Sequence, residues 1–404
     1  MYQSKLISKT RRQISQAEES LNAKILIKAG YIEQVMAGVY AYLPLGYRVL
    51  KNIENIVREE LDKISAQELL LPALHPKSYW EKTGRWDSLD VLYRFTSYYT
   101  GTELALGSTH EEIITPIATN FIQSYQDLPF ATYQIQTKFR DEKRAKSGIL
   151  RGREFIMKDL YSFHSSSEDL DKYYEIVTQA YINIYRRLGI GDITLKTYAS
   201  GGSFSKYSHE FQTISDIGED TIFVCEQCNI AINKEIITEQ KSCPECNNSN
   251  LIQKQAIEVG NIFKLQTNYS EAFNLEYTDA NGLNQLVIMG CYGIGISRLM
   301  GTLVEIFANN ESKMTWPESV SPFHIHLIVL NTDSKDVMQK AEELYINLQN
   351  NNQTVLFDNR NERPGIKFAE ADLLGIHKRI IISSKTISQN GVEIDNNIVP
   401  FDKI

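Results

Sequence analysis

The alternation of strand-like and helix-like text after WPESVSPF, residues 316–323, is the strongest constraint on the fold. HIHLIVLN, TVLFD and RIIISS have the character of buried strands, whereas VMQKAEELYINLQNN and PGIKFAEADLLG read as helices. The second helix has Pro364 near its first position, where proline is tolerated. Strands that alternate with helices imply a parallel α/β unit. We therefore expect a separate domain over residues 321–404.

The text before this domain mixes helices and strands without that alternation. Ser15 to Glu18 has the S-x-x-E form of a capping box, which predicts a helix running toward Gly30. Apolar residues at helical spacing predict a helix over 46–64, which leads into ELLLPALHP, a short strand that stops at Pro72. Strands are expected at 103–107, 132–140 and 153–159, and a helix at 167–188.

Composition places the chain among ordinary globular proteins, with 42% hydrophobic and 23% charged residues. No apolar run approaches the roughly 18 residues that would suggest a membrane span. The start, MYQSKLISKTRRQ, lacks the apolar centre of a signal peptide, so a cytoplasmic location is expected. The net charge of −8 does not indicate nucleic-acid binding by itself, so any such contact needs local concentrations of cations.

Four of the five cysteines lie within 22 residues, as Cys225-x2-Cys228-x14-Cys243-x2-Cys246. In a reducing compartment, clustered cysteines are more often metal ligands than disulfides. The two pairs have the spacing of a structural four-thiolate zinc site, and unliganded thiols are the alternative. Catalytic zinc is not expected, because four cysteine ligands leave no open coordination position.

The densest chemistry lies in TKFRDEKRAKSGILRGREFIMKDLYSFH, residues 137–164. Between residues 138 and 158 eight basic residues face three acidic ones, a local balance of +5. Lys138, Arg140 and Glu142 would share a face if the strand continued through them. An arginine can grip a phosphate, a glutamate can accept from an adenine amino group, and Phe155 could stack on a base. A merely solvated basic hairpin explains the same pattern.

A second motif, GCYGIGISR, brings Gly290, Gly293 and Gly295 close to Arg298. It is neither a P-loop nor a dinucleotide fingerprint, because no G-K-[ST] or downstream acid follows. Glycines that let the backbone approach adenine, with an arginine for a terminal phosphate, would make another sort of ATP site. Tight backbone packing is the alternative reading.

Together these pieces resemble the class II aminoacyl-tRNA synthetases. The helix and strand ending at Pro72 resemble motif 1, FRDE with RxxxFxxxD resembles motif 2, and GIGISR resembles motif 3. More narrowly, the chain resembles bacterial prolyl-tRNA synthetases. The matching phrases are TGRW, GSTHEE, YQIQTKFRDE, REFIMKD, SHEFQ, EVGNIF, YSEA, GCYGIG and ERPGIKFAEADLLGI, spread over most of the chain.

The resemblance implies an α/β (α+β) fold. It consists of an antiparallel-sheet catalytic domain with flanking helices and a small α/β anticodon-binding domain. The catalytic domain is expected in two parts, 1–224 and 254–320, separated by a short four-cysteine insertion over 225–253, with the anticodon domain at 321–404. Motif 1 implies a homodimer.

The family's functional residues can be placed where the motifs match. Proline is expected at Thr109, Glu111, Arg140 and His209, with the carboxylate and hydroxyl receiving the imino group. A turn with a capping acid, and a structural histidine, are the plainer alternatives. His209 follows two more residues after GGS than the family pattern has. Arg140 and Arg298 are expected to be catalytic, and the ATP-binding set is Arg140, Glu142, Arg151, Phe155, Gln212, Gly293, Gly295 and Arg298.

The implied reaction needs ATP and Mg²⁺. Proline would attack the α-phosphorus, and prolyl-adenylate would then acylate the 3′ hydroxyl of tRNA(Pro). No general base is required, and Cys291 is expected to be a packed thiol. For the anticodon, the expected residues are Arg360, Glu362, Arg363 and Lys367; a solvated charged surface is the alternative.

Longer bacterial relatives carry a large editing domain between GED and EVGNIF, where this chain has only 37 residues, 221–257. So short a segment needs a staple, which a zinc-held knuckle would provide. We expect no clearance of Ala-tRNA(Pro) in cis, and a separate trans-editing protein as a partner. Two other readings stay open. One is a non-catalytic synthetase-like paralogue, and the other is a class II synthetase for another amino acid.

Overall fold

The computed structural model describes residues 1–11, 13, 20–202, 204 and 206–404. The expected capping box at Ser15 to Glu18 lies outside these residues, and the first described α-helix is α1 (Leu21–Lys28). The chain forms two compact units. The first contains Met1–Val35, Tyr40–Ile53 and Leu303–Ile404, and the second contains Met36–Val39 and Glu54–Thr302. Helices α2 (Pro44–Asp62) and α8 (Ile296–Phe307) have residues in both.

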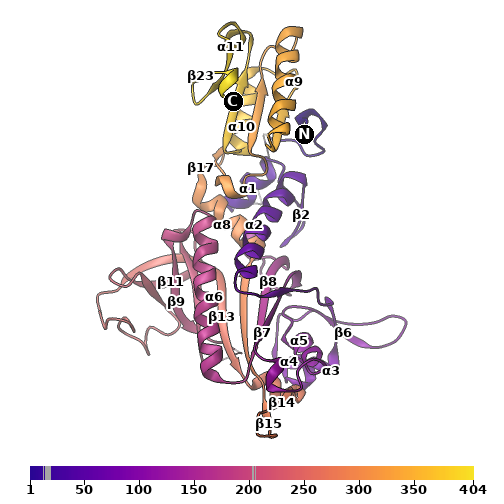
Figure 1. The fold of residues 1–404 in the computed structure, drawn as a ribbon, viewed down its shortest axis with the longest axis vertical. Helices are drawn as coiled ribbons and strands as arrows, with labels where there is room; N and C mark the ends of the chain where they lie inside the picture. The colour runs from indigo at the N-terminus through magenta and orange to yellow at the C-terminus, as the bar shows by residue number, and fades with distance from the viewer. Residues whose placement is uncertain (12, 14–19, 203, 205) are drawn as a thin grey trace. The chain divides into compact units, whose positions relative to one another are not determined.

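The second unit is built on a nine-stranded, largely antiparallel sheet (Figure 1). The strand order is β10-β9-β12-β11-β13-β16-β8-β7-β3. The bounds are β3 (Gln67–Glu68), β7 (Phe130–Phe139), β8 (Glu154–His164), β9 (Thr194–Ser200), β10 (Tyr207–Ile214), β11 (Asp220–Cys225), β12 (Ile230–Asn233), β13 (Ile252–Gln266) and β16 (Ile288–Gly295).

Helix α6 (Ser167–Arg187) runs along one face of this sheet (Figure 1). It starts where Ser166 accepts a hydrogen bond from the Asp169 amide, an N-cap that satisfies one of the first free N–H groups. Tyr181 and Tyr185 are buried and pack against Phe211 of β10. The helix therefore fills one face of the sheet and leaves the other face for the site.

The cysteine segment contributes strand β12, which closes part of the sheet on itself. Strand β12 pairs with β11 and, in parallel, with β9, while β10 pairs with both β9 and β13. Because β11 also pairs with β13, the strands β10, β9, β12, β11 and β13 form a closed ring. We call the segment from Cys225 to Cys246 the knuckle.

Smaller elements complete the second unit. A three-stranded sheet has the order β4-β6-β5, with β4 (Leu74–Pro76), β5 (Arg94–Thr96) and β6 (Glu103–Leu106). The helices are α3 (Lys77–Lys82), α4 (Arg85–Ser88), α5 (Glu111–Ala118) and α7 (Asn268–Phe273), followed by the hairpin of β14 (Glu276–Thr278) and β15 (Asn284–Leu286). Strand β8, helix α5 and helix α7 share one apolar core.

The first unit contains the expected C-terminal α/β sheet, in the order β20-β19-β21-β22-β23. Strand β19 pairs in parallel with β20 and β21, as the alternation predicted. The bounds are β19 (Ile325–Val329), α9 (Lys335–Asn350), β20 (Val355–Asp358), α10 (Pro364–Leu374), β21 (Lys378–Ile382), α11 (Ser384–Ser388), β22 (Gly391–Ile394) and β23 (Asn397–Pro400).

The N-terminal residues belong to this same unit. The Met1 ammonium donates to Tyr345 Oη at 2.7 Å, and the buried Tyr31 hydroxyl accepts from Trp316 Nε1 at 3.0 Å. This unit also holds strand β1 (Ile32–Met36) as far as Val35 and strand β2 (Val39–Tyr42) from Tyr40. The short pair β17 (Ala308–Asn310) and β18 (Lys313–Met314) lies in it as well. The contacts are long-range pairings that no local pattern encodes.

Most expected elements form within a residue or two of their predicted ends. There are two exceptions: the strand expected at 153–159 continues to His164, and ELLLPALHP gives only the two-residue strand β3 and the short β4 on either side of Pro72. Proline has no amide hydrogen to donate to a ladder, so a longer strand cannot run through it. Within the described residues, no helix is both long and apolar enough to cross a membrane.

Candidate active site

The second unit has a cavity of about 360 Å³ on the sheet. Nine of the residues expected to bind substrates line it, and they come from motifs far apart in the sequence. They are Thr109, Glu111, Arg140, Glu142, Arg151, Phe155, Gly293, Gly295 and Arg298. Strands β7 and β8 pair so that Lys138 faces Phe155, and β8 pairs with β16 so that Asp159 faces Gly293. The antiparallel register therefore brings the motifs together.

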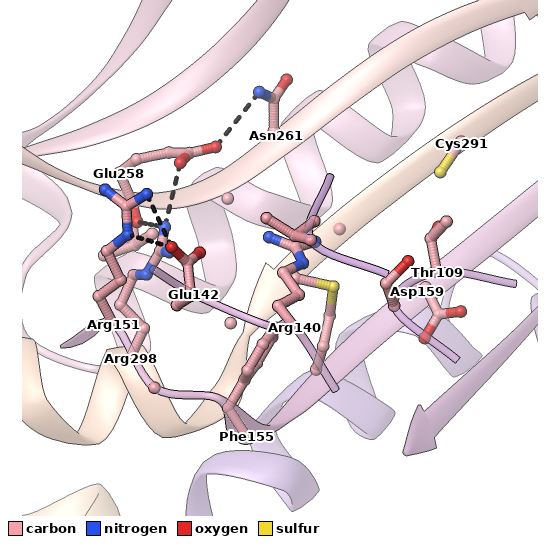
Figure 2. Close-up of a pocket in the computed structure, with 18 of the residues that line it drawn as sticks. Thr109, Arg140, Glu142, Arg151, Phe155, Asp159, Glu258, Asn261, Cys291 and Arg298 are labelled. Atoms are coloured by element: carbon pink, nitrogen blue, oxygen red, sulfur yellow. Dashed lines mark hydrogen bonds and ion pairs between the residues drawn. The ribbon is translucent and has the colours of Figure 1, made fainter. Parts of the chain in front are cut away.

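Arg140 lies between the two ends of the cavity (Figure 2). Its guanidinium is 5.2 Å from the centre of the Phe155 ring, and within the described residues it has no hydrogen-bonded or ion-paired partner. Burial, followed by repulsion from Arg298, lowers the pKa of Arg140. A half-buried cation without an anion costs free energy, and a ligand that supplies the negative charge would offset that cost.

One end of the cavity carries charged groups in pairs. Glu142 binds Arg151 at 3.0 Å, and Glu258 binds Arg298 at 3.0 Å (Figure 2). Arg298 also donates to the Leu150 and Glu258 carbonyls at 2.9 and 2.8 Å, which fixes the direction of its side chain. A Cβ on Gly293 would meet no protein atom closer than 3.8 Å, so protein packing does not require this glycine. The space in front of it is the cavity.

The other end holds the fully buried carboxylate of Glu111. Glu111 opens helix α5, accepts from the Thr109 hydroxyl, and accepts from the Cys291 thiol at 2.9 Å. Burial, together with the nearby Glu111 charge, raises the pKa of Cys291 well above its usual value, so it remains a neutral thiol. As expected, Cys291 is packed and is not activated as a nucleophile.

Lys138 does not share the cavity with Arg140 and Glu142. Strand β7 ends at Phe139, so the expected alternation stops before Arg140, and Lys138 is fully buried. Its ammonium is 2.7 Å from Asp159 Oδ1 and 2.7 Å from His110 Nδ1. Lys138 therefore neutralises the Asp159 carboxylate and does not line the cavity, so it is not available to bind a substrate phosphate.

Two expected residues are not brought to this cavity. His209 lies on the α6 face of β10, where its Nδ1 is 2.7 Å from Tyr174 Oη. Gln212 is fully buried, and its amide donates to Glu210 at 2.9 Å and to Asp220 at 2.8 Å. Since side chains alternate along a strand, Glu210 and Gln212 lie on the face of β10 opposite to His209.

Two cavity residues, Glu258 and Asn261, were not singled out from the sequence. They are three apart, and a regular strand would point them to opposite faces. Phe211 pairs with Gly260 and Gln212 with Glu258, so Val259 is an extra residue in the ladder. This β-bulge turns both side chains toward the cavity. The glycine after Val259 was the available sign of such a bulge.

The knuckle brings its four cysteine sulfurs within 4.8 Å of one another. Cys225 Sγ and Cys246 Sγ are 3.7 Å apart, close to the roughly 3.8 Å that tetrahedral Zn–S bonds of 2.3 Å require. Each Cys-x-x-Cys turn is followed by an asparagine with positive φ, Asn229 at 54° and Asn247 at 59°. Their amides donate to the carbonyls of Cys225 and Cys243, so the two turns have one geometry.

The four residues expected to contact the anticodon lie in the first unit around the start of α10. Glu362 and Arg363 are exposed. Arg360 is ion-paired with Asp358 at 2.8 Å and Glu370 at 2.7 Å. Lys367 is only 1% exposed, and its ammonium donates to the Val329 carbonyl at 2.7 Å. Its position does not suit contact with a phosphate, because the side chain stabilises the ends of β19 and β20.

Comparison with known proteins defines the class. The family described as tRNA synthetase class II core domain (G, H, P, S and T) matches residues 93–307, and the anticodon binding domain family matches residues 324–397. The fold agrees with that of a Giardia lamblia prolyl-tRNA synthetase solved with prolyl-adenylate. The TM-score is 0.79 at 17% identity, over 95% of this chain and 75% of that one. The chain therefore has the fold of a class II aminoacyl-tRNA synthetase and belongs to that class.

The relatives narrow this class. A proline–tRNA ligase from Ehrlichia chaffeensis is 39% identical over 400 residues, covering 95% of this chain and 92% of that protein. Another, from Dehalococcoides mccartyi, is 31% identical, covering 100% of this chain and 98% of that protein. The chain belongs to the proline–tRNA ligase family. The second alignment runs over 559 positions against the 404 residues here, so much of that longer relative has no counterpart in this chain.

Proposed function

We propose that the chain activates proline with ATP and transfers the prolyl group to tRNA(Pro), as its family membership implies. The observation that carries the proposal is Arg140, a guanidinium in the cavity with no anionic partner among the described residues. It lies between a charged end and a carboxylate end (Figure 2). Such a cation suits the place where the proline carboxylate meets the ATP α-phosphate.

ATP is assigned to the charged end. Phe155 offers a face for adenine, Glu142 an acceptor for its amino group, and Gly293 and Gly295 allow close approach of the backbone. Arg298 is assigned to the γ-phosphate, with Arg151 beside it. Gln212 is left out of this assignment, because it does not line the cavity and its amide is already bound to Glu210 and Asp220.

Mg²⁺ fits the carboxylates at this end. Glu258 lines the main cavity, and Asp220 lines an adjoining one together with Arg140 and Arg298. Burial, and to a smaller extent the nearby charge of Glu258, raises the pKa of Asp220. Magnesium is commonly held by one or two carboxylates and by substrate phosphates. When bound, it would neutralise charge on the departing pyrophosphate.

Proline is assigned to the carboxylate end. A secondary ammonium has two N–H donors, and the Thr109 hydroxyl with the Glu111 carboxylate offers two acceptors. The Cys291 thiol holds Glu111 from the other side at 2.9 Å. His209 is not part of this pocket in our proposal, because its side chain packs on α6. The proline carboxylate would then lie beside Arg140.

The chemistry follows from positioning. The carboxylate attacks the α-phosphorus in line, pyrophosphate leaves, and the charge that develops is stabilised by Arg140 and Arg298. The 3′ hydroxyl of the tRNA terminal ribose then attacks the acyl carbon of prolyl-adenylate, and AMP leaves. The substrate carboxylate is already ionised at neutral pH, so the first step needs no general base.

The test is exchange of labelled pyrophosphate into ATP, with each amino acid supplied in turn. Exchange with proline alone supports the proposal. Exchange that depends on a different amino acid would overturn it, and so would the absence of exchange with every amino acid. Arg140→Ala is expected to reduce proline-dependent exchange by at least 10²-fold. The control is Lys143→Ala, an exposed cation of the same loop that does not line the cavity. Equal activity in the two variants would refute the role of Arg140.

For the knuckle, we propose a structural zinc ion bound by Cys225, Cys228, Cys243 and Cys246. The sulfur spacing and the two matching turns support it. Metal analysis of the purified chain should find one zinc per chain, and Cys228→Ser should abolish it. A chain that folds fully without metal would contradict the assignment.

We further propose that this chain does not clear Ala-tRNA(Pro), because the knuckle occupies the place of the editing domain. A separate deacylase acting in trans would then be needed. Purified protein incubated with Ala-tRNA(Pro) should leave it intact over the time in which a longer family member deacylates it. Hydrolysis by this chain would overturn the proposal.

Two binding surfaces complete the proposal. Exposed Arg363 and Glu362 are assigned to the anticodon. Arg360 is assigned there too, with its side chain oriented by Asp358 and Glu370.

A homodimer through motif 1 is supported by Leu70, which is 74% exposed just before Pro72, and Leu74, which is 50% exposed just after it. Exposed apolar side chains so close together suit a partner surface. Sedimentation equilibrium at micromolar concentration should give twice the mass of one chain.

A further inference from the structure

Glu210, on strand β10, is a buried carboxyl group. Among the residues that the resemblance assigns to substrates, it contacts Gln212 alone within the described part of the chain. It is 8% exposed and accepts three amide donors. Gln212 Nε2 and Asn233 Nδ2 each lie 2.9 Å from Oε2, and Asn261 Nδ2 lies 3.4 Å from Oε1. Burial, followed by repulsion from Glu258, raises the pKa of Glu210 to about 8, whereas the bonds from Gln212 and Asn233 lower it. Each donor lost would leave a buried acceptor oxygen without a partner. Glu210 is therefore the meeting point of three separate segments.

One of the donors comes from the knuckle. Asn233 is the last residue of β12, is 5% exposed, and accepts from the Glu235 amide at 3.1 Å through Oδ1. A backbone N–H can only donate, so this bond fixes which end of the Asn233 amide is oxygen. The nitrogen must then point to Glu210. The orientation is set inside the insertion.

The other two donors lead to the nucleotide end of the cavity. Asn261 Nδ2 also donates to Glu258 Oε1 at 3.2 Å, and Glu258 binds Arg298 (Figure 2). Gln212 donates to Asp220 at 2.8 Å. The chain of bonds thus runs from the knuckle through Glu210 to both carboxylates that face the ATP region.

We propose that Asn233 is a positioning residue for the nucleotide site, and that the insertion acts on catalysis through the Asn233–Glu210 hydrogen bond. With this bond in place, Glu210 holds Asn261 and Gln212 in one arrangement, and these hold Glu258 and Asp220. The insertion then helps to orient the ATP-binding residues, in addition to replacing the editing domain. This inference rests on the proposed assignment of ATP and Mg²⁺ to that end.

A positioning role for Asn233 predicts different effects on the KM values for ATP and proline, whereas a purely structural role predicts similar effects on both. Proline is assigned to the Thr109 and Glu111 end, which this chain of bonds does not reach. Loss of the Asn233 donor should therefore raise the KM for ATP and leave the KM for proline unchanged. A buried acceptor left without its donor corresponds to roughly a tenfold change in an equilibrium constant.

The experiment is proline-dependent pyrophosphate exchange by the full chain, with both KM values measured. Asn233→Leu removes the donor at similar volume and is expected to raise the KM for ATP roughly tenfold. Asn233→Asp should raise it further, because two carboxylates then face each other. Glu210→Gln combined with Asn233→Asp restores a donor and an acceptor in reversed order, and should recover part of the loss. The control is Asn250→Leu, an exposed position beside the knuckle.

Zinc content and thermal unfolding are measured on every variant. Asn233→Leu with the parental zinc content and the parental KM for ATP would overturn the inference. A rise of equal size in both KM values, without recovery in the double variant, would also overturn it and leave only a structural role. Failure of the proposed function looks different, because the unaltered chain would then show no proline-dependent exchange at all.

Discussion

At the scale of single residues, the contrast between Arg140 and Lys138 is informative. Both cations come from TKFR, yet Lys138 is neutralised by Asp159 at 2.7 Å, and Arg140 has no such partner in the described residues. The sequence pattern placed both on one expected strand face and assigned phosphate binding to Arg140. Only the folded structure, in which the Lys138 ammonium reaches Asp159 across the β7–β8 pair, shows which cation is left for a ligand. A motif identifies the charge but does not identify its counter-ion.

Lys138→Met is expected to destabilise the second unit by about 3–5 kcal/mol, because Asp159 would remain buried without a cation. Urea unfolding monitored by tryptophan fluorescence measures this change. The matched control is Lys143→Met, which makes the same substitution at an exposed site and should change stability by less than about 0.5 kcal/mol.

Asp159→Asn in the Lys138→Met background should recover much of that loss, since the orphaned charge is removed. A double variant no more stable than the single one would show that Lys138 acts through packing alone. Tyr161 and Gln134 also donate to Asp159, at 2.8 and 3.0 Å, so full recovery is not expected.

At the scale of elements, periodicity predicted the helices and strands of both units well, because apolar spacing is a local property. It could not predict the bulge at Val259, which turns Glu258 and Asn261 to one side. It also could not pair β12 with β9 or show that Asn233 reaches Glu210. These contacts depend on strands that meet only after folding.

Helix α10 offers an element-scale prediction. It ends at Gly375, whose φ is +65°, and a Cβ there would lie 2.8 Å from Met314 Cγ and its carbonyl oxygen. Gly375→Ala is expected to destabilise the first unit by about 1–3 kcal/mol through strain and overlap. Thermal unfolding followed by circular dichroism measures it.

Gly365→Ala, in the same helix, is the matched control. A Cβ there meets nothing within 4 Å, and alanine favours a helix over glycine by up to about 1 kcal/mol. This variant should be neutral or slightly more stable. If the two substitutions had equal effects, the left-handed cap would not be the cause.

At the scale of the whole molecule, buried histidines link stability to pH. Burial lowers the pKa to about 4 in His75, about 3 in His209 and His326, and about 2 in His110. These side chains stay neutral in the folded chain, whereas the unfolded chain takes up protons below about pH 6.5. Stability is therefore complete above that pH and is lost as the pH falls.

Between pH 7.5 and pH 5.5, each of these histidines should cost the folded state about 1.4 kcal/mol. Urea unfolding at the two pH values, with each unit followed separately, measures the sum. His75→Gln keeps a donor for the Pro72 carbonyl and should reduce the difference by one histidine's share. An unchanged difference in that variant would assign the pH dependence to other groups.

The knuckle strand β12 protects the chain from aggregation, because it closes the ring of strands. Without β12, strand β9 would present a row of unpaired amides and carbonyls along one side, and the same would hold for β11. Open strand edges of this kind recruit other chains and lead to aggregation. An insertion as short as this one therefore cannot be reduced to a simple loop without exposing that edge, which sets a lower limit on how small this catalytic core can become.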